Sequence, residues 1–439
     1  MASSDAETPA ISLRGKFTAD TAWTFSAFGV FAVGGAFICL FVAGRQGGEA
    51  LGVFNQVYAL YVVAAQLATL GIHDSAQKHV AQHADDPALV RAVSRGAVAA
   101  VLRTAIPVAL VFGLGASFIG RLADSEPVGR GVLVVAPALV LFALNKTLLG
   151  VLNGQRRMRA YALGQIARSA IIALGVVGVG LSPLPDWALV GGFALAELML
   201  CPALLVALRA ELGRAPADEA ASWRAKHLRF GARALPNSLL AESFIRIDIL
   251  MLGLLTSDAE VGLYSLAALF VEGLYQIAIV VRTVANPLLV KLWAAGRRAE
   301  LAAFCRRIGA VSLLGASAVG AAVYLAFPWL DLWLSAPLVA GAGELLPVLL
   351  AGLVVAAAFV PSDHLLLQAG RPGKQSLLMT ANVALNVALN AVLIPRYGPL
   401  GAAFATAAAF VGSAIALNLA AARWLGMTRT VFASPPRAG

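Results

Sequence analysis

Charged residues and cysteines are scarce in this chain, and each scarcity excludes a class of protein. Only 13% of the 439 residues are charged, whereas a soluble globular domain carries about 25%. Hydrophobic residues make up 60%, and the mean hydropathy is +0.82. This composition excludes a soluble enzyme, a disordered protein and a nucleic-acid-binding protein, although the formal net charge is +10. Three cysteines without a Cys-x-x-Cys pair exclude a zinc knuckle and a disulfide framework.

Long apolar runs fill the rest of the chain. A helix of roughly 20 apolar residues crosses the hydrocarbon core of a bilayer. The runs are continuous and do not alternate, which excludes a membrane β-barrel. The first run, of about 23 residues, is longer than the core of a secretory signal. We therefore predict an all-α polytopic membrane protein with about twelve transmembrane helices. The predicted spans are 21–43, 51–72, 96–120, 132–152, 162–181, 188–208, 234–255, 261–289, 308–327, 345–367, 376–394 and 402–422.

The distribution of lysine and arginine tests this count. With the N-terminus placed in the cytoplasm, the cytoplasmic segments hold 24 of these residues, the outer loops 4 and the spans 5. Cytoplasmic loops carry the excess of positive charge in membrane proteins. The pattern favours twelve spans with both termini in the cytoplasm, and we expect the bacterial inner membrane as the location.

The spans divide into two halves of six, related by a weak repeat. Gly52-Val53-Phe54 opens the second span and Gly262-Leu263-Tyr264 the eighth, an offset of about 210 residues. An even number of spans per half predicts a parallel repeat, which is typical of transporters with a site between the halves. The predicted parts are a cytoplasmic N-terminal tail (1–20), an N-terminal bundle (21–208), a basic cytoplasmic linker (209–233), a C-terminal bundle (234–422) and a cytoplasmic C-terminal tail (423–439).

Charged residues inside the spans mark candidate sites, since intramembrane charge is costly and usually functional. A rise of 1.5 Å per residue puts Arg246 about 18 Å deep and Glu272 about 16 Å deep, both near the midplane. Glu242 lies one turn before Arg246 on the same helix face. These residues predict a centre for substrate binding or ion coupling, or a structural ion pair between two helices. Asp248 faces the opposite side and is expected to pair with a different helix.

Four further cations share one layer near the cytoplasmic edge. Arg103, Lys146, Arg168 and Arg282 each lie about 9–11 Å from that edge by the same helical rise. Together they would form a vestibule for a phosphate or pyrophosphate group, which arginine binds bidentately. The alternative is that each long side chain reaches the interface on its own.

Two other polar features lie within the spans. Asn382, Asn386 and Asn390 form one stripe, which suits either a sugar-binding path or hydrogen bonding between helices. Glu197 is a lone midplane carboxylate in sequence, either a proton site for ion coupling or a buried protonated carboxyl.

Three stretches resemble the polysaccharide-biosynthesis (Wzx-like) oligosaccharide-lipid flippases of the multidrug/oligosaccharidyl-lipid/polysaccharide exporter superfamily. The first is Leu70-Gly71-Ile72 with Ser75, Lys78 and Val80. The second runs from Arg229 to Pro287 and contains Arg246-x-Asp248 and Glu260-Val-Gly-Leu-Tyr264. The third runs from Leu365 to Thr406. The resemblance covers most of the chain, and the order and spacing of the motifs make it specific.

The resemblance implies two six-helix bundles arranged as a V and a cationic central cavity. It also implies alternating access driven by an ion gradient, with H⁺ or Na⁺ as the coupling ion, without ATP and without a cofactor. The implied substrate is a polyprenyl-pyrophosphate-linked oligosaccharide, a precursor of O-antigen, capsule or exopolysaccharide. Few charges in the first span, and the absence of two extra C-terminal spans, separate the chain from the related lipid II flippases.

We therefore predict a flippase rather than an enzyme, with membrane lipids as surroundings and a glycan polymerase or glycosyltransferases as partners. The first alternative is a multidrug or metabolite cation antiporter of the same fold, which would prefer an acidic cavity. The second is a non-transporting scaffold for glycan-assembly enzymes, in which buried midplane charge would affect only stability.

Overall fold

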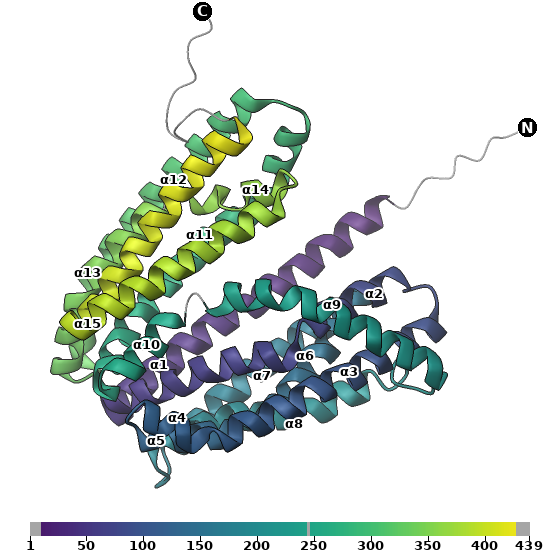
Figure 1. The fold of residues 1–439 in the computed structure, drawn as a ribbon, viewed down its shortest axis with the longest axis horizontal. Coiled ribbons are helices and arrows are strands. Elements are labelled where there is room, and N and C mark those ends of the chain that lie inside the picture. The colour runs from purple at the N-terminus through teal and green to yellow at the C-terminus, as the bar shows by residue number, and fades with distance from the viewer. Residues whose placement is uncertain (1–9, 244–245, 427–439) are drawn as a thin grey trace, which may run out of the picture. The chain divides into compact units, whose positions relative to one another are not determined.

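The computed structural model describes residues 10–243 and 246–426, and every regular element within these ranges is helical (Figure 1). The predicted all-α class is confirmed. In chain order the elements are α1 (Ala10–Thr69), α2 (Ile72–Gln82), α3 (Pro87–Leu114), α4 (Ala116–Leu122), α5 (Glu126–Val135), α6 (Ala138–Gly154), α7 (Met158–Gly180), η1 (Asp186–Val190), α8 (Gly191–Ala207), α9 (Ala217–Ser243), α10 (Ile247–Leu255), α11 (Asp258–Ala294), α12 (Arg298–Ala326), η2 (Phe327–Leu332), α13 (Ala336–Ala357), η3 (Val360–Ser362), α14 (Leu365–Gln368) and α15 (Pro372–Leu425).

Long apolar helices make the chain a multi-pass membrane protein. In the described ranges, eight helices are long and apolar enough to cross a bilayer, and the bent pair α5–α6 adds a ninth if it forms one span. Two of the eight are interrupted at glycines with positive φ, Gly47 in α1 (φ 91°) and Gly398 in α15 (φ 55°). Glycine adopts this conformation without a steric penalty. Both breaks lie where the sequence predicts an outer turn, and the count of twelve crossings stays a prediction.

The chain packs as two compact units that interleave along the sequence. The first unit takes its residues from Met1–Ile38, Val63–Ala116 and Gly131–Ser238, and the second from Cys39–Val62, Ser117–Arg130 and Leu239–Gly439. The long helix α1 therefore contributes to both units. The bundle boundaries derived from the sequence stay a prediction.

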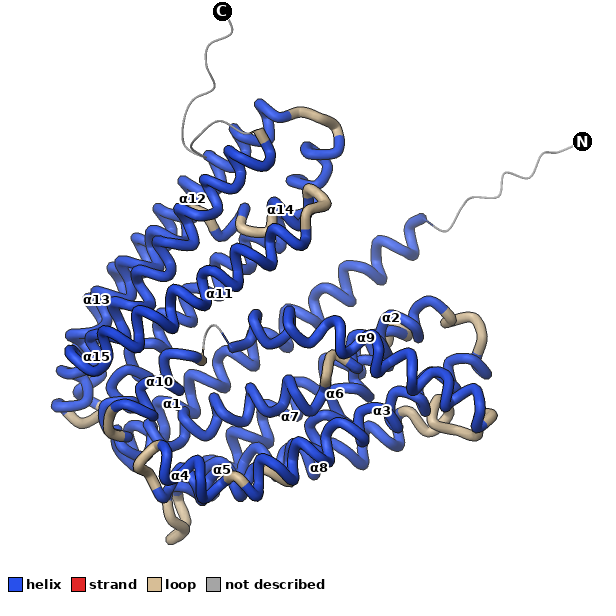
Figure 2. The backbone as a smooth tube through the Cα atoms, in the orientation of Figure 1, coloured by secondary structure: helices blue, strands red, loops and turns tan. Residues whose placement is uncertain are grey.

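In the first unit, α6 is the central helix, since it packs against α2, α3, α7 and α8 (Figure 2). Its buried leucines, Leu148 and Leu152, belong to a core formed with residues of α2, α3 and α8. The start of α3 is fixed locally, because Asp86 accepts hydrogen bonds from the amides of Ala88 and Leu89, each at 3.0 Å. An Asp cap of this kind stabilises a helix start by about 1 kcal/mol.

Most of the basic segment 209–233 is helical. Helix α9 begins at Ala217, well before the apolar run that starts at Ala234. One face of its polar half is buried through Trp223 and His227, while Lys226 is exposed. The helix therefore begins before the predicted span 234–255, because hydropathy alone does not detect its polar amphipathic part.

In the second unit, α13 is the central helix and packs against α11, α12 and α15. Helix α11 opens with a capping box, in which the Ser257 hydroxyl accepts from the Glu260 amide and the Glu260 carboxylate accepts from the Ser257 amide. Such a box satisfies two backbone donors that the first turn of a helix leaves free. The sequence thus fixes the start of the helix that carries Tyr264, Glu272 and Arg282.

A reciprocal glycine contact joins α1 and α11 within this unit. A Cβ atom on Gly52 would lie 1.8 Å from the Asp258 carbonyl oxygen, and one on Gly262 would lie 1.9 Å from the Gly48 carbonyl oxygen. Gly52 and Gly262 are 210 residues apart in sequence, and so are Gly48 and Asp258. Each helix therefore supplies the close glycine at one contact and the carbonyl oxygen at the other. Such exchange is the mark of a two-fold relation. The weak repeat read from the sequence therefore has a structural counterpart at this crossing.

Candidate functional site

Arg246, for which the sequence predicts midplane depth, is paired with Glu272. Its guanidinium nitrogen is 3.7 Å from the Glu272 carboxylate, and the guanidinium stands 4.7 Å from the centre of the Tyr58 ring. Arg246 is the residue directly before α10, while Glu272 lies on α11 and Tyr58 on α1. The pair is longer than a direct hydrogen bond, and both side chains are partly exposed. The side chain of Glu242 lies outside the described residues.

Asp248 forms a second centre with donors from other helices. Its carboxylate accepts hydrogen bonds from the Tyr264 hydroxyl at 2.8 Å, the Thr406 hydroxyl at 2.5 Å and the Asn390 amide at 2.7 Å. The side chain is only 4% exposed. Among the residues that the structure describes, no cation pairs with it. Charge of this kind is costly in a membrane interior, and a proton or a small cation would neutralise it. The expected pairing of Asp248 with other helices is confirmed.

The three asparagines of the predicted stripe have different hydrogen-bond contacts. The Asn390 amide also donates to the Asn386 side-chain oxygen at 3.1 Å, and both residues are buried. These two side chains therefore join α15 to α10 instead of standing free for a sugar. Asn382, one turn earlier, has a buried side-chain oxygen with no hydrogen-bond partner among the described residues. The Asn390 side-chain oxygen likewise has no hydrogen-bond partner there, so Asn382 and Asn390 both keep unused acceptor capacity.

Glu197 is not a lone carboxylate, which corrects the sequence-based description of it. Two Arg168 nitrogens lie 2.9 and 3.1 Å from its two carboxylate oxygens, an ion pair between α7 and α8 in which the farther nitrogen, Nη2, donates a hydrogen bond. The Asn145 amide on α6 adds a bond of 2.8 Å to the same carboxylate. Both charged side chains are buried. The pair was missed because sequence cannot show which way α7 and α8 face.

The remaining cations of the predicted vestibule differ in their surroundings. Arg168 and Lys146 stand over the same Phe142 ring, at 5.1 and 5.7 Å from its centre. Arg103 is exposed on α3. These three lie in the first unit and Arg282 in the second. Convergence of all four on one vestibule stays a prediction.

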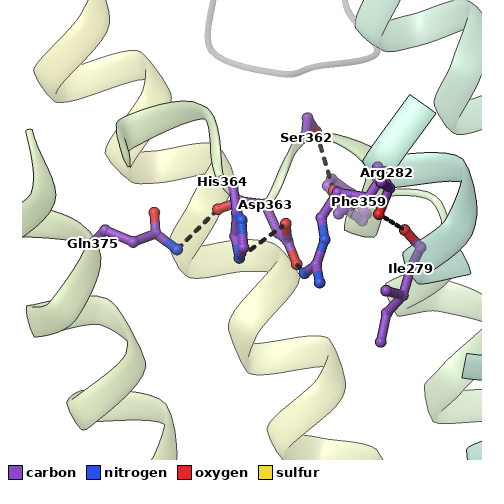
Figure 3. Close-up of polar contacts among 8 residues, drawn as sticks. Ile279, Arg282, Phe359, Ser362, Asp363, His364 and Gln375 are labelled. Carbon is purple, nitrogen blue, oxygen red and sulfur yellow. Dashed lines mark hydrogen bonds and ion pairs between the residues drawn. The ribbon is translucent and has the colours of Figure 1, made fainter. Parts of the chain in front are cut away.

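Arg282 is held at a break in the helical structure of the second unit (Figure 3). Its guanidinium donates to the Asp363 carboxylate at 2.7 Å, and the His364 ring lies 3.9 Å from the other carboxylate oxygen. The Gln375 amide on α15 donates to the Asp363 carbonyl oxygen at 3.0 Å. Asp363 follows η3 and precedes α14, so the arginine fastens this short irregular segment to α11. Arg282 is therefore already occupied by a carboxylate.

Several partners of the predicted residues were not recognised as partners from the sequence. Tyr58, Tyr264 and Thr406 contact Arg246 or Asp248, and Asn145 contacts Glu197. The available signal was polarity within an apolar run, since Asn145 and Thr406 both stand in predicted spans.

Comparison with known families agrees with this architecture. The model of the polysaccharide biosynthesis protein family matches residues 19–293, which is more than half of the chain. No curated protein matches the chain significantly.

Solved structures share the fold at low sequence identity. The lipid II flippase MurJ in an inward closed conformation superimposes with a TM-score of 0.73 at 13% identity, covering 92% of this chain and 87% of its own. An inward-facing multidrug resistance MATE family transporter of the MOP superfamily gives 0.69 at 14% identity, covering 87% and 92%. A MOP superfamily transporter from Pyrococcus furiosus, described as having a binding pocket of reverse polarity, gives 0.59 at 14% identity, covering 89% and 90%. The chain thus has the helical fold of MOP-superfamily transporters, and by its family match it belongs to the polysaccharide biosynthesis protein family.

Proposed function

We propose that the protein moves a polyprenyl-pyrophosphate-linked oligosaccharide from the cytoplasmic to the outer leaflet of a bacterial inner membrane. The family match supports the substrate class, and the transporter fold supports movement across a bilayer. The observation that carries the proposal is the ion pair of Glu272 with Arg246, an arginine predicted to lie at midplane depth. An intramembrane cation with a partly exposed partner suits an anionic headgroup. Glycosyltransferases would supply this substrate and a glycan polymerase would consume it.

In the proposed cycle, substrate phosphate replaces Glu272 at the guanidinium of Arg246. Arginine offers planar donors that match phosphate oxygens, and Tyr58 covers one face of the guanidinium. The released Glu272 carboxylate would then gain a proton or face water. The polyprenyl tail stays in lipid, because its transfer to water would cost about 0.8 kcal/mol per methylene group.

Coupling to an ion gradient is assigned to the Asp248 centre. Its three hydrogen-bond donors come from α11 and from both parts of α15, on either side of the Gly398 break. Binding of H⁺ or Na⁺ to the carboxylate would neutralise it and change how tightly these helices are held. A ligand shifts a conformational equilibrium only by its differential affinity for the two states. The ion would therefore favour the state in which Asp248 is best enclosed.

The experiment that tests the proposed function uses purified protein in liposomes. A polyprenyl-pyrophosphate oligosaccharide is loaded into the membrane, and a glycosidase outside the vesicle trims each molecule that reaches the outer leaflet. We expect protein-dependent trimming that is faster under a proton or sodium gradient. Trimming that equals that of protein-free vesicles would contradict the proposal.

The second candidate function is cation antiport, favoured by one observation. Asp248 is a buried carboxylate that no described cation neutralises, as a site for a cationic substrate would need. The same vesicles loaded with a cationic dye separate the two functions. Gradient-driven dye efflux without movement of the lipid-linked oligosaccharide would establish antiport.

A further inference from the structure

An open pocket between α2 and α9 lies apart from the charged centres described above. Its volume is about 550 Å³, and its exposed lining is mostly apolar. All lining residues belong to the first unit. They are His79, Lys226, Arg229, Phe230, Arg233 and Ala234.

The cations of this pocket form one face of α9. Lys226, Arg229 and Arg233 follow a spacing of three and four residues, which places them side by side on a helix. All three are exposed, and no carboxylate of the described residues lies within salt-bridge distance of them. Lys78 on α2 adds a fourth cation, 5.5 Å from the centre of the Phe230 ring. This face contrasts with Arg168, Arg246 and Arg282, each of which has a carboxylate partner.

The pocket lies where the polar part of α9 meets its apolar part. The predicted span begins at Ala234, which is itself a lining residue. By helical rise, Arg233 lies about 1.5 Å and Arg229 about 7.5 Å outside that boundary. The headgroup layer of a bilayer extends about 5–7.5 Å beyond the hydrocarbon core on each side. Measured from this predicted boundary, the two arginines lie at headgroup level, with Phe230 between them in sequence and Ala234 at the hydrocarbon edge.

Buried contacts fix α9 against its neighbours and hold the pocket in shape. The His227 Nε2–H donates to the Val93 carbonyl oxygen at 3.1 Å, and Nδ1 accepts from the Ser75 hydroxyl at 2.8 Å. The Trp223 ring contacts the rings of His79 and His227, with centres 5.0 and 5.9 Å apart. A rigid pocket requires no ordering of α9 when a ligand binds.

We propose that this pocket binds one anionic phospholipid of the surrounding bilayer. The lipid phosphate lies between Arg229 and Arg233, with Lys226 and Lys78 nearby, and the glycerol and upper acyl chain lie against Phe230 and Ala234. Basic pockets at the membrane interface bind anionic lipid headgroups in this way. Arginine matches phosphate geometry, and an apolar floor suits the chain and not a free ion. This assignment is independent of the transport substrate.

The test measures thermal unfolding of delipidated protein in neutral detergent while phospholipid is added. Dioleoylphosphatidylglycerol should raise the unfolding temperature in a saturable manner, and dioleoylphosphatidylcholine should not. In the Arg229→Gln/Arg233→Gln variant the apparent Kd for phosphatidylglycerol should rise about tenfold or more, because each lost charge contact costs about a factor of five. The matched control is Arg209→Gln/Arg214→Gln, two exposed arginines of the same segment that do not line the pocket.

Three results would overturn the proposal. The first is an equal loss of affinity in both double variants, which would reflect net charge only. The second is equal stabilisation by glycerol 3-phosphate or inorganic phosphate, which would make the pocket a simple anion site. The third is stabilisation by a polyprenyl phosphate with none by phosphatidylglycerol, which would make the pocket part of the substrate path. Restored affinity in Arg229→Lys/Arg233→Lys would support the proposal, since charge is kept.

Discussion

Single residues of the Asp248 centre give the clearest test of ion coupling. Asp248→Asn keeps the size of the side chain and its contact with the Tyr264 hydroxyl but removes the negative charge. We expect the variant to transport at one rate with or without an ion gradient, because no charge remains for the ion to neutralise. The measurement is transport in vesicles with and without the gradient. Asp331→Asn, at an exposed carboxylate of the same unit, serves as the control and should keep its gradient dependence. Unchanged gradient stimulation in Asp248→Asn would contradict the assignment of ion coupling to the Asp248 centre.

The buried pair of Arg168 and Glu197 is expected to matter for stability first. Glu197→Gln leaves a buried guanidinium without its counter-charge, and breaking a buried pair in this way costs about 3–5 kcal/mol. The variant should unfold at markedly lower denaturant concentration, while Arg168→Met/Glu197→Gln should recover much of the loss. Glu126→Gln, at the exposed pair with Arg130, is the control and should change little. Normal stability of Glu197→Gln with altered pH dependence of transport would favour the proton-site alternative.

His227 makes the stability of the first unit depend on pH. Burial lowers the pKa of its imidazole from 6.5 to about 4. The folded state therefore binds fewer protons than the unfolded state between these values, so its stability is complete above about pH 6.5 and falls as the pH drops toward 4. His73, whose pKa burial lowers to about 3, adds to the same trend. Denaturation at several pH values should show a shallower dependence in His227→Gln than in the native protein. Identical slopes for both would contradict the assignment.

Residue-level expectations held where depth along a helix was enough to place a side chain. Arg246 and Glu272 were expected at the same level from two neighbouring spans, and they are paired. Glu197 and Arg168 lie in spans whose facing directions depend on rotation about the helix axis, which an apolar sequence does not determine. The partners Tyr264 and Thr406 were missed for the same reason.

At the scale of elements, the crossing of α1 and α11 sets a sharp steric limit. Gly262→Ala would place Cβ about 1.9 Å from the Gly48 carbonyl oxygen, so the helices must move apart. We expect a loss of several degrees in unfolding temperature and less folded protein. Gly273→Ala on the same helix meets no atom within 4 Å and should be neutral or slightly stabilising, since alanine is the better helix former. Equal behaviour of the two variants in thermal unfolding would contradict the crossing.

Helix type and order were predictable because apolar runs are long and continuous. The boundaries were less so, because α9 starts within the polar segment 209–233 and buries only a narrow face through Trp223 and His227. The glycines at the breaks of α1 and α15 were not singled out as turns, although positive φ is common for glycine between helices.

At the scale of the whole molecule, the family match and the transporter fold agree with the sequence-based expectation of a membrane transporter. The repeat of the two halves was visible in sequence as one short motif and appears in the structure as the reciprocal contact of Gly52 and Gly262. The identity of the proposed glycan, by contrast, could not be predicted, because no sequence motif specifies the side chains that would contact it.

The central claim is that Arg246 carries the phosphates of the transported lipid, and one measurement tests it directly. Arg246→Gln and Arg396→Gln, the latter at an exposed position of the same unit, are compared in the vesicle assay at equal protein content and equal unfolding temperature. The account predicts that Arg246→Gln loses at least about tenfold in transport rate, as expected when a charged contact worth about 1.4 kcal/mol or more is removed, and that Arg396→Gln transports normally. Equal transport by both folded variants would contradict it.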